Sequence, residues 1–216
     1  MSLSFAERGE AAELAALLAR LLRWEKAAAA RLQADGQVLG VFAKPARFDV
    51  LAIRPLRLAE PARLDITVSA GELLEGIDDA AGTARVPAAV TGPSWAGVLP
   101  PRGGWEPVAE LDHAGVRGAA EAVVAEFRER TEALAAPERT RDALDALAEE
   151  IWSRTLSGTP LPLRAVHAAR SLGFLRAAAP VAVLARGVWL RLRTPLGSIA
   201  VRRPGTTTPG LTVTPR

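Results

Sequence analysis

Cysteine does not occur in this chain of 216 residues, and tyrosine is absent as well. Without cysteine the chain can form no disulfide, no thiolate metal site and no cysteine nucleophile. No apolar run approaches the roughly 18 uninterrupted residues of a membrane span. Residues 1–4 lead straight into a charged helical pattern, without the apolar core of a signal peptide. We therefore expect a cytoplasmic protein that has no membrane partner.

Acidic residues are missing from the last third of the chain. Glu150 is the last of them, and residues 151–216 contain ten Arg but no Asp, Glu or Lys. The first 150 residues hold the other 17 basic side chains and all 24 acidic ones, so they carry −7 against +10 for the rest. Such asymmetry indicates an acidic or polyanionic partner for the C-terminal part.

Catalytic and metal-binding patterns are scarce. The two histidines, His113 and His167, fall in different expected elements, and no H-x-x-x-H or two-His-one-carboxylate spacing occurs. The G-x-S-x-G, Walker A and G-x-G-x-x-G motifs are absent too. We expect no cofactor and no metal, and we favour a non-enzymatic protein. An acid–base pair assembled from distant carboxylates is the alternative.

The residues that are present predict an α+β fold. Residues 4–7 read Ser-Phe-Ala-Glu, a capping box that predicts a helix ending between Trp24 and Ala28. Asp35-Gly36 is a type I′ hairpin signal between two strand-like runs. A second capping box, at residues 69–72, predicts a short helix. The four strand-like runs of this part form an expected meander, and they cover residues 28–34, 37–43, 48–54 and 63–68.

A connector rich in Pro, Gly and Trp follows, and after it a helical segment leads into a second meander. Asp112 is the expected N-cap of a long helix. Two further helices are predicted: one begins at Pro137, and the other extends from Pro162 to Leu172. The second meander has runs at residues 181–185, 188–193, 198–203 and 211–214. We expect one compact body with three parts, namely residues 1–85, a connector at 86–111, and a helical and basic part at 112–216.

The two meanders can be superposed as an internal duplication. Residues 34–36 align with 185–187, and after a gap residues 51–54 align with 199–202. The fold prediction is therefore two lobes, each a helix followed by an antiparallel meander, around a central helical segment. Any two meanders with tight Gly turns align about this well, so a chance match is the alternative. Duplicated meanders could join into one sheet or stand as separate lobes.

The second meander carries the main candidate binding surface. Alternation places Leu190 and Leu192 on one face of the sheet. The opposite face then carries an aromatic side chain among guanidinium groups, which suits phosphates and stacked bases. The alternative is that the acidic helix at residues 138–150 covers this face with ion pairs. The candidate residues are Trp189, Arg191, Arg193, Arg202 and Arg203.

Two further surfaces are candidates. The helix near Pro162 followed by a hairpin is similar to a winged helix, with Arg164, His167 and Arg170 expected to be exposed. An ordinary amphipathic helix with a solvated basic face is the alternative. In the connector, Trp95 and Trp105 are candidate contacts for a ligand, although such side chains often anchor a loop to its own core.

These patterns favour a non-enzymatic binding or adaptor protein. Its basic C-terminal lobe would engage an acidic protein surface or a second copy of the chain. The first alternative is a nucleic-acid-binding protein of winged-helix or basic-sheet type, and the second is an enzyme that needs no metal.

Overall fold

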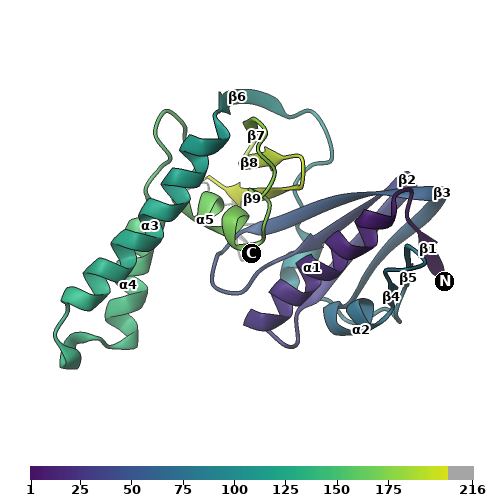
Figure 1. Cartoon of the computed structure of the whole chain (residues 1–216), viewed down its shortest axis with the longest axis horizontal. Coiled ribbons are helices and arrows are strands. Elements are labelled where there is room, and N and C mark those ends of the chain that lie inside the picture. The colour runs from purple at the N-terminus through teal and green to yellow at the C-terminus, as the bar shows by residue number, and fades with distance from the viewer. Residues whose placement is uncertain (204–216) are drawn as a thin grey trace, which may run out of the picture.

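The computed structural model describes residues 1–203 and contains a mixed sheet-and-helix architecture (Figure 1). A six-stranded antiparallel sheet has the order β2-β3-β9-β8-β7-β6, so strands from both halves of the chain share one sheet. The α+β class predicted from the sequence is confirmed. The strands are β2 (Ala29–Ala43), β3 (Leu51–Ser69), β6 (Glu106–Leu111), β7 (Val181–Arg186), β8 (Trp189–Thr194) and β9 (Gly197–Arg202).

Side-chain caps mark where several helices begin. The backbone N–H of Gly115 donates to the Asp112 carboxylate at 2.9 Å, and that of Glu72 donates to Ser69 Oγ at 3.3 Å. Both expected N-caps are confirmed, because each satisfies an amide that lacks a partner within its helix. The helices are α1 (Arg8–Trp24), α2 (Ala70–Glu75), α3 (His113–Ala133), α4 (Arg141–Ser153) and α5 (Leu163–Ser171), with 3-10 turns η1 (Ser94–Gly97) and η2 (Ala136–Glu138).

The first helix does not begin at the expected capping box. Strand β1 (Ser2–Ser4) occupies that stretch and pairs with β5 (Thr83–Arg85), which also pairs with β4 (Ile77–Asp78). Glu7 precedes α1 without a side-chain capping bond. The prediction was wrong here because pairing with a strand some 80 residues away holds the Ser4 backbone extended.

Asp35-Gly36 does not form a hairpin turn. Strand β2 runs straight through it, and the pairing with β3 continues from Ala29 opposite Ser69 to Ala43 opposite Ala52. The register shifts between Gly36 and Val38, and Gly36 has φ +97°. One type of β-bulge uses a left-handed glycine as a type I′ turn does, so the same local signal suits both structures. The expected four-stranded meander of this half is therefore wrong: it is one long hairpin that turns at residues 44–50.

The second meander is confirmed through β7, β8 and β9, and its fourth run at residues 211–214 lies outside the described residues. Residues 51–54 and 199–202, which the duplication aligns, are paired neighbours: Leu51 lies opposite Ala200 and Ile53 opposite Ser198. Gly36 lies in a bulge whereas Gly187 lies in the β7–β8 turn, so these two positions are not equivalent. The two-lobe description is therefore not confirmed in detail, and both halves contribute to one sheet.

Helices cover one face of the sheet, and part of the connector covers the other. The main core joins Leu14 and Leu18 of α1, Val166 of α5, and sheet residues such as Leu32 and Leu190. A smaller cluster on the opposite face contains Phe42, Leu51, Ile53, Trp189 and Ala200. Within residues 1–203, no helix is both long enough and apolar enough to cross a bilayer.

Candidate binding site at the junction of the two halves

Strand β8 follows the predicted alternation, but its aromatic side chain is covered. Leu190 and Leu192 are fully buried in the main core, and Arg193 is exposed on the opposite face. Trp189 is only 9% exposed, because it packs with Phe42 and Ala200 in the smaller cluster. The expectation that this indole offers an open face for base stacking is therefore wrong.

The connector lies on this same face and is anchored by its tryptophans. Trp95 and Trp105 pack against the smaller cluster, and Trp105 Nε1 donates to the Pro101 carbonyl at 2.9 Å. The guanidinium of Arg191 lies 5.4 Å from the centre of the Trp105 ring, a cation–π distance. Burial, with a smaller effect of neighbouring Arg193, lowers the pKa of Arg191. Both tryptophans thus have packing roles, and Trp95 also lines a groove described below.

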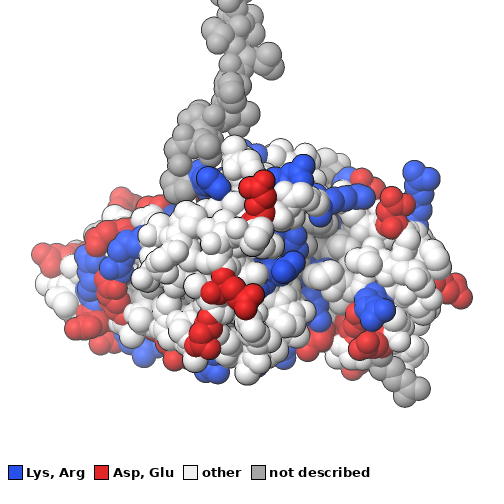
Figure 2. All heavy atoms as spheres, turned by 90° about the horizontal axis from the view of Figure 1, so that it is seen from above, with Lys and Arg blue, Asp and Glu red and all other residues white. Residues whose placement is uncertain are grey.

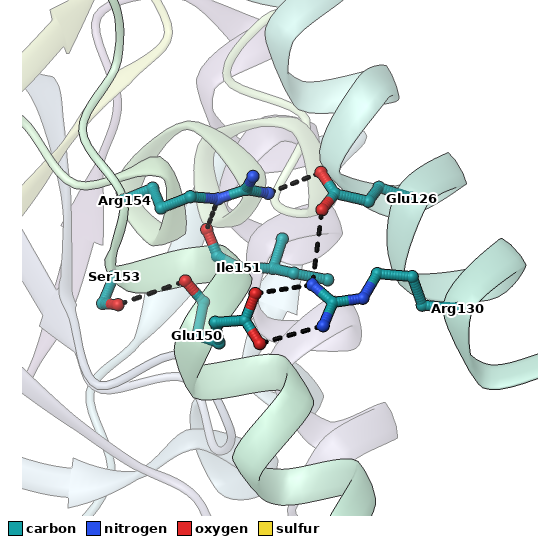
Figure 3. A network of polar contacts seen from close by, with 6 residues as sticks. All are labelled: Glu126, Arg130, Glu150, Ile151, Ser153 and Arg154. Carbon is teal, nitrogen blue, oxygen red and sulfur yellow. Dashed lines mark hydrogen bonds and ion pairs between the residues drawn. The ribbon is translucent and has the colours of Figure 1, made fainter. Parts of the chain in front are cut away.

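The acidic helix forms no ion pair with Arg191 or Arg193, two of the candidate sheet arginines, within the described residues. Helix α4 packs on α3 and α5, where Arg130 holds Glu150 through two hydrogen bonds of 2.6 and 2.9 Å, and Arg154 bonds Glu126 at 2.5 Å (Figure 3). Among residues 1–203, no carboxylate forms an ion pair with Arg191 or Arg193. The alternative prediction, that the acidic helix at residues 138–150 forms ion pairs with this face, is therefore wrong for Arg191 and Arg193.

Helix α5 is not an exposed recognition helix. The Arg164 side chain is 19% exposed. It forms an ion pair with Glu149 at 2.5 Å and a second, longer one with Asp49 at 4.0 Å. His167 is partly buried between aromatic rings, and its pKa is lowered to about 4, first by burial and then by Arg170. Arg170 is exposed, 3.9 Å from Glu121. The predicted exposure is thus wrong for Arg164 and His167, and the strands that follow belong to the large sheet rather than to a wing.

A groove of about 560 Å³ opens where the β2–β3 turn meets η1, α5 and the end of β9. We call it the junction groove. Its charged lining consists of Lys44, Asp49, Glu149, Arg164, Arg202 and Arg203, and its remaining lining residues are Val50, Leu51, Ser94, Trp95, Val98, Ser153, Pro162, Trp189, Ala200 and Val201. The groove is therefore mostly apolar, with four cationic and two anionic side chains.

Local contacts hold the charged lining of the groove in place. Lys44 and Asp49 pair at 2.9 Å across the hairpin turn, and this contact with Lys44 lowers the pKa of Asp49. The guanidinium of Arg202 lies 5.2 Å from the centre of the Trp189 ring. Seen from above, a run of basic side chains crosses the middle of the molecule with acidic side chains beside it, and both signs are also interspersed at the α3–α4 end (Figure 2).

Three further arginines converge where α1 meets the segment after α5. A Cβ on Gly173 would lie 3.1 Å from Arg176 Nε and 3.2 Å from Arg20 Nη2. Arg54, which is 7% exposed, donates to the Leu196 carbonyl. Burial lowers the pKa of both Arg20 and Arg54, and the charge of Arg176 adds to this effect, whereas Glu13 near both and Glu10 near Arg54 oppose it. We call Arg20, Arg54 and Arg176 the helix-side arginine cluster, and Glu13, 2.6 Å from Arg176, offsets part of its charge.

Comparisons with known proteins assign the two halves separately. Residues 1–97 match the family model described as Domain of unknown function (DUF8010), and residues 100–206 match Domain of unknown function (DUF8185). No curated protein matches the sequence. The two matched regions meet inside the connector.

Solved structures that resemble the whole chain include DNA polymerase sliding clamps. The clamp of Pseudomonas aeruginosa is 12% identical with a TM-score of 0.52, and that of Caulobacter crescentus is 14% identical with a TM-score of 0.54. The alignments cover 100% of this chain and 68% and 69% of those chains. This chain resembles a sliding clamp in fold. A further structure, of the C. crescentus beta sliding clamp, has a TM-score of 0.50 and is described as having PEG bound to a "putative beta-motif tethering region".

In this clamp-like fold, the junction groove combines residues that sequence analysis left apart. The structure places candidates from three predicted surfaces around one groove: Trp189, Arg202 and Arg203 of the second meander, Arg164 of the helix and Trp95 of the connector. The β2–β3 turn was missed as a site element because residues 44–47 only separated two of the predicted strand-like runs. No sequence signal relates this turn to α5, more than a hundred residues later. Within residues 1–203, no group of His, Asp or Glu could hold a metal ion.

Proposed function

We propose that this protein is a non-enzymatic, clamp-like adaptor that binds an acidic and partly apolar segment of a partner protein in the junction groove. The observation that carries the proposal is the composition of that groove, an apolar surface bordered by more cationic than anionic side chains. Apolar area supplies affinity, while complementary charge selects the partner and its orientation. The clamp-like fold supports a scaffold role, since a small molecule occupies a "putative beta-motif tethering region" in one solved clamp.

A display library of short random peptides tests this function. We expect wild-type protein to enrich peptides that combine apolar side chains with Asp or Glu. Val98 lies in the groove and is 48% exposed, so Val98→Glu adds a negative charge there without burying it. Affinity for an enriched peptide should fall about ten-fold, as expected for one unfavourable charge contact at an interface.

The matched control is Val108→Glu. Val108 is 41% exposed and does not line the groove, so this variant should bind the same peptide as wild type does. Enrichment of basic peptides, or equal weakening by both substitutions, would contradict the proposal.

Nucleic-acid binding is the second candidate, and the helix-side arginine cluster favours it. Like charges that converge and are partly desolvated are stabilised by an anionic ligand. The sliding clamps of similar fold are proteins of DNA polymerase. Arg191 and Arg193, which lack an ion-paired carboxylate among residues 1–203, would form a second basic surface.

Fluorescence anisotropy with labelled duplex DNA at increasing salt separates the two candidates. Several phosphate contacts predict a steep fall of affinity with salt, and Arg20→Ala should make that dependence shallower by about one unit of log–log slope. Arg63→Ala, on the strand β3 and outside the cluster, is the control. Unmeasurable DNA binding at low salt would exclude this second function and leave the peptide proposal intact.

A further inference from the structure

A second cavity lies where the end of α1 and the β2–β3 turn face α3, α4 and α5. Its volume is about 980 Å³, at the upper end of the roughly 300–1,000 Å³ of small-molecule sites. We call it the aromatic pocket. Arg164 and Glu149 line both this pocket and the junction groove. Arg47, Ala148 and the aromatic side chains of the pocket do not line the junction groove.

Five rings form a continuous row along the pocket. Trp24 meets Phe48 edge to face at 5.1 Å between ring centres, and Phe48 meets His167 in the same way at 5.1 Å. His167 then stacks on Trp152 at 5.1 Å, and Trp152 stacks on Phe127 at 5.0 Å. All five side chains line the cavity, so it presents an aromatic wall.

The imidazole in this row behaves as an aromatic ring at neutral pH. Burial lowers the pKa of His167 to about 4, so it is uncharged there. The cationic groups of the pocket are therefore arginines alone. Two of them have carboxylates close by: Arg164 lies 2.5 Å from Glu149, and Arg141 lies 3.6 Å from Asp145.

Arg47 is the third arginine of the pocket, and it has no ion pair among the described residues. Its backbone conformation is also unusual. It has φ 81°, a left-handed conformation that a side chain other than Gly or Asn rarely adopts. Its side chain is exposed and lines the pocket, and no carboxylate among residues 1–203 forms an ion pair with it. Packing of the two halves accounts for the rings, but it does not account for a cation without an ion pair beside them. Arg47 lies in the β2–β3 turn, where Asp49 also has a positive φ of 48°. Strain of this kind is often kept where a side chain must reach a ligand.

The geometry points to the aromatic pocket as a binding site for a planar aromatic compound that carries a single anionic group. The rings offer stacking surfaces for the planar part. The guanidinium of Arg47 offers a charge-assisted hydrogen bond to the anionic group. The lining has three arginines against Asp145 and Glu149, which fits one negative charge on the ligand.

Isothermal titration calorimetry with β-naphthoate tests the site, and its uncharged amide, β-naphthamide, serves as the comparison. Wild-type protein should bind the acid more tightly than the amide. Arg47→Gly removes the charge and relieves the backbone, because glycine adopts this φ without strain. The affinity for naphthoate should fall about ten-fold in this variant, as for one lost charge-assisted bond, and that for naphthamide should not change.

A pair of substitutions on α4 locates the binding. Ala148→Trp fills the pocket and should abolish binding of both compounds. Ala146→Trp places the same side chain on an exposed position of the same helix outside the pocket, and binding should persist. Circular dichroism of both variants confirms that each is folded.

Three outcomes would overturn the inference. The first is no binding of naphthoate at millimolar concentration. The second is equal affinity for the acid and the amide, which would remove the role of Arg47. The third is equal binding by folded Ala148→Trp and wild type, which would place the compound elsewhere. The peptide proposal survives all three, because Val98 does not line this pocket.

Discussion

The environment of His167 shows how single side chains acquire their properties. The sequence places this residue on the polar side of an amphipathic helix, among arginines. In the structure its ring lies between Phe48, from the other half of the chain, and Trp152 of α4. Burial disfavours the charged imidazolium, with Arg170 adding to the effect, and the pKa is lowered to about 4.

This lowered pKa predicts how stability depends on pH. The unfolded chain, with an ordinary pKa of 6.5, binds more protons than the folded one between about pH 6.5 and pH 4. The free energy of unfolding should therefore fall as the pH is lowered through this window, by on the order of 2 kcal/mol for this group. His167→Gln should remove that part of the dependence, as measured by urea unfolding at several pH values. Parallel pH profiles for wild type and variant would contradict the buried neutral state.

At the scale of elements, glycine shows why local signals mislead. Gly36 occupies a bulge inside β2, whereas Gly187 occupies a true turn, and both have positive φ, +97° and 53°. The sequence predicted the positive φ at both sites correctly. Which of the two structures forms depends on the partner strand, and β3 continues past the bulge. The positions of caps such as Asp112 were predictable, because a cap needs only amides within three residues.

Two glycine substitutions should have opposite effects. Gly36→Ala places a Cβ in open space, so only the positive φ opposes it, and we expect a loss of about 1–2 kcal/mol of stability. Gly118 lies exposed in α3, also with open space around a Cβ, and Gly118→Ala should stabilise by roughly 0.5–1 kcal/mol. Denaturant unfolding of the two variants checks both signs. A neutral Gly36→Ala would argue against the bulge.

The contact between α3 and α4 should depend on charge. Arg130 binds Glu150 with two parallel hydrogen bonds and also lies 3.6 Å from Glu126 (Figure 3). Arg130→Glu places like charges together and should lower the melting temperature, and adding Glu150→Arg should restore part of the loss. Thermal melts at low and high salt measure the effect, which salt should weaken. No recovery in the double variant would show that the pair does not hold these helices together.

At the scale of the whole molecule, the two halves are joined by backbone pairing as well as by side chains. Strand β3 pairs with β9, Arg176 of the C-terminal half binds Glu13 of α1, and Arg54 donates to the Leu196 carbonyl. Each half matches a separate family model, but the main core contains side chains from both. Shared burial of this kind makes the unfolding of one half expose the apolar surface of the other.

We therefore predict one cooperative unfolding transition for the chain. Tryptophan fluorescence, which includes Trp24 in the first half and Trp189 in the second, should follow the same urea curve as far-ultraviolet circular dichroism. Two separated transitions would show that the junction contributes little to stability. Both binding sites at the junction would then lose their shape when either half unfolds.

The sequence by itself determined the fold class, the α5 helix, the caps of α2 and α3, and the alternation that buries Leu190 and Leu192, since each depends on residues close in the chain. It also determined the charge asymmetry. Only the tertiary structure decided that Asp35-Gly36 bulges instead of turning, that β6 and β1 are strands, and that the β2–β3 turn lies against α5. These features depend on pairing and burial between segments far apart in the chain. Local side-chain patterns carry no record of which distant segment will supply the partner.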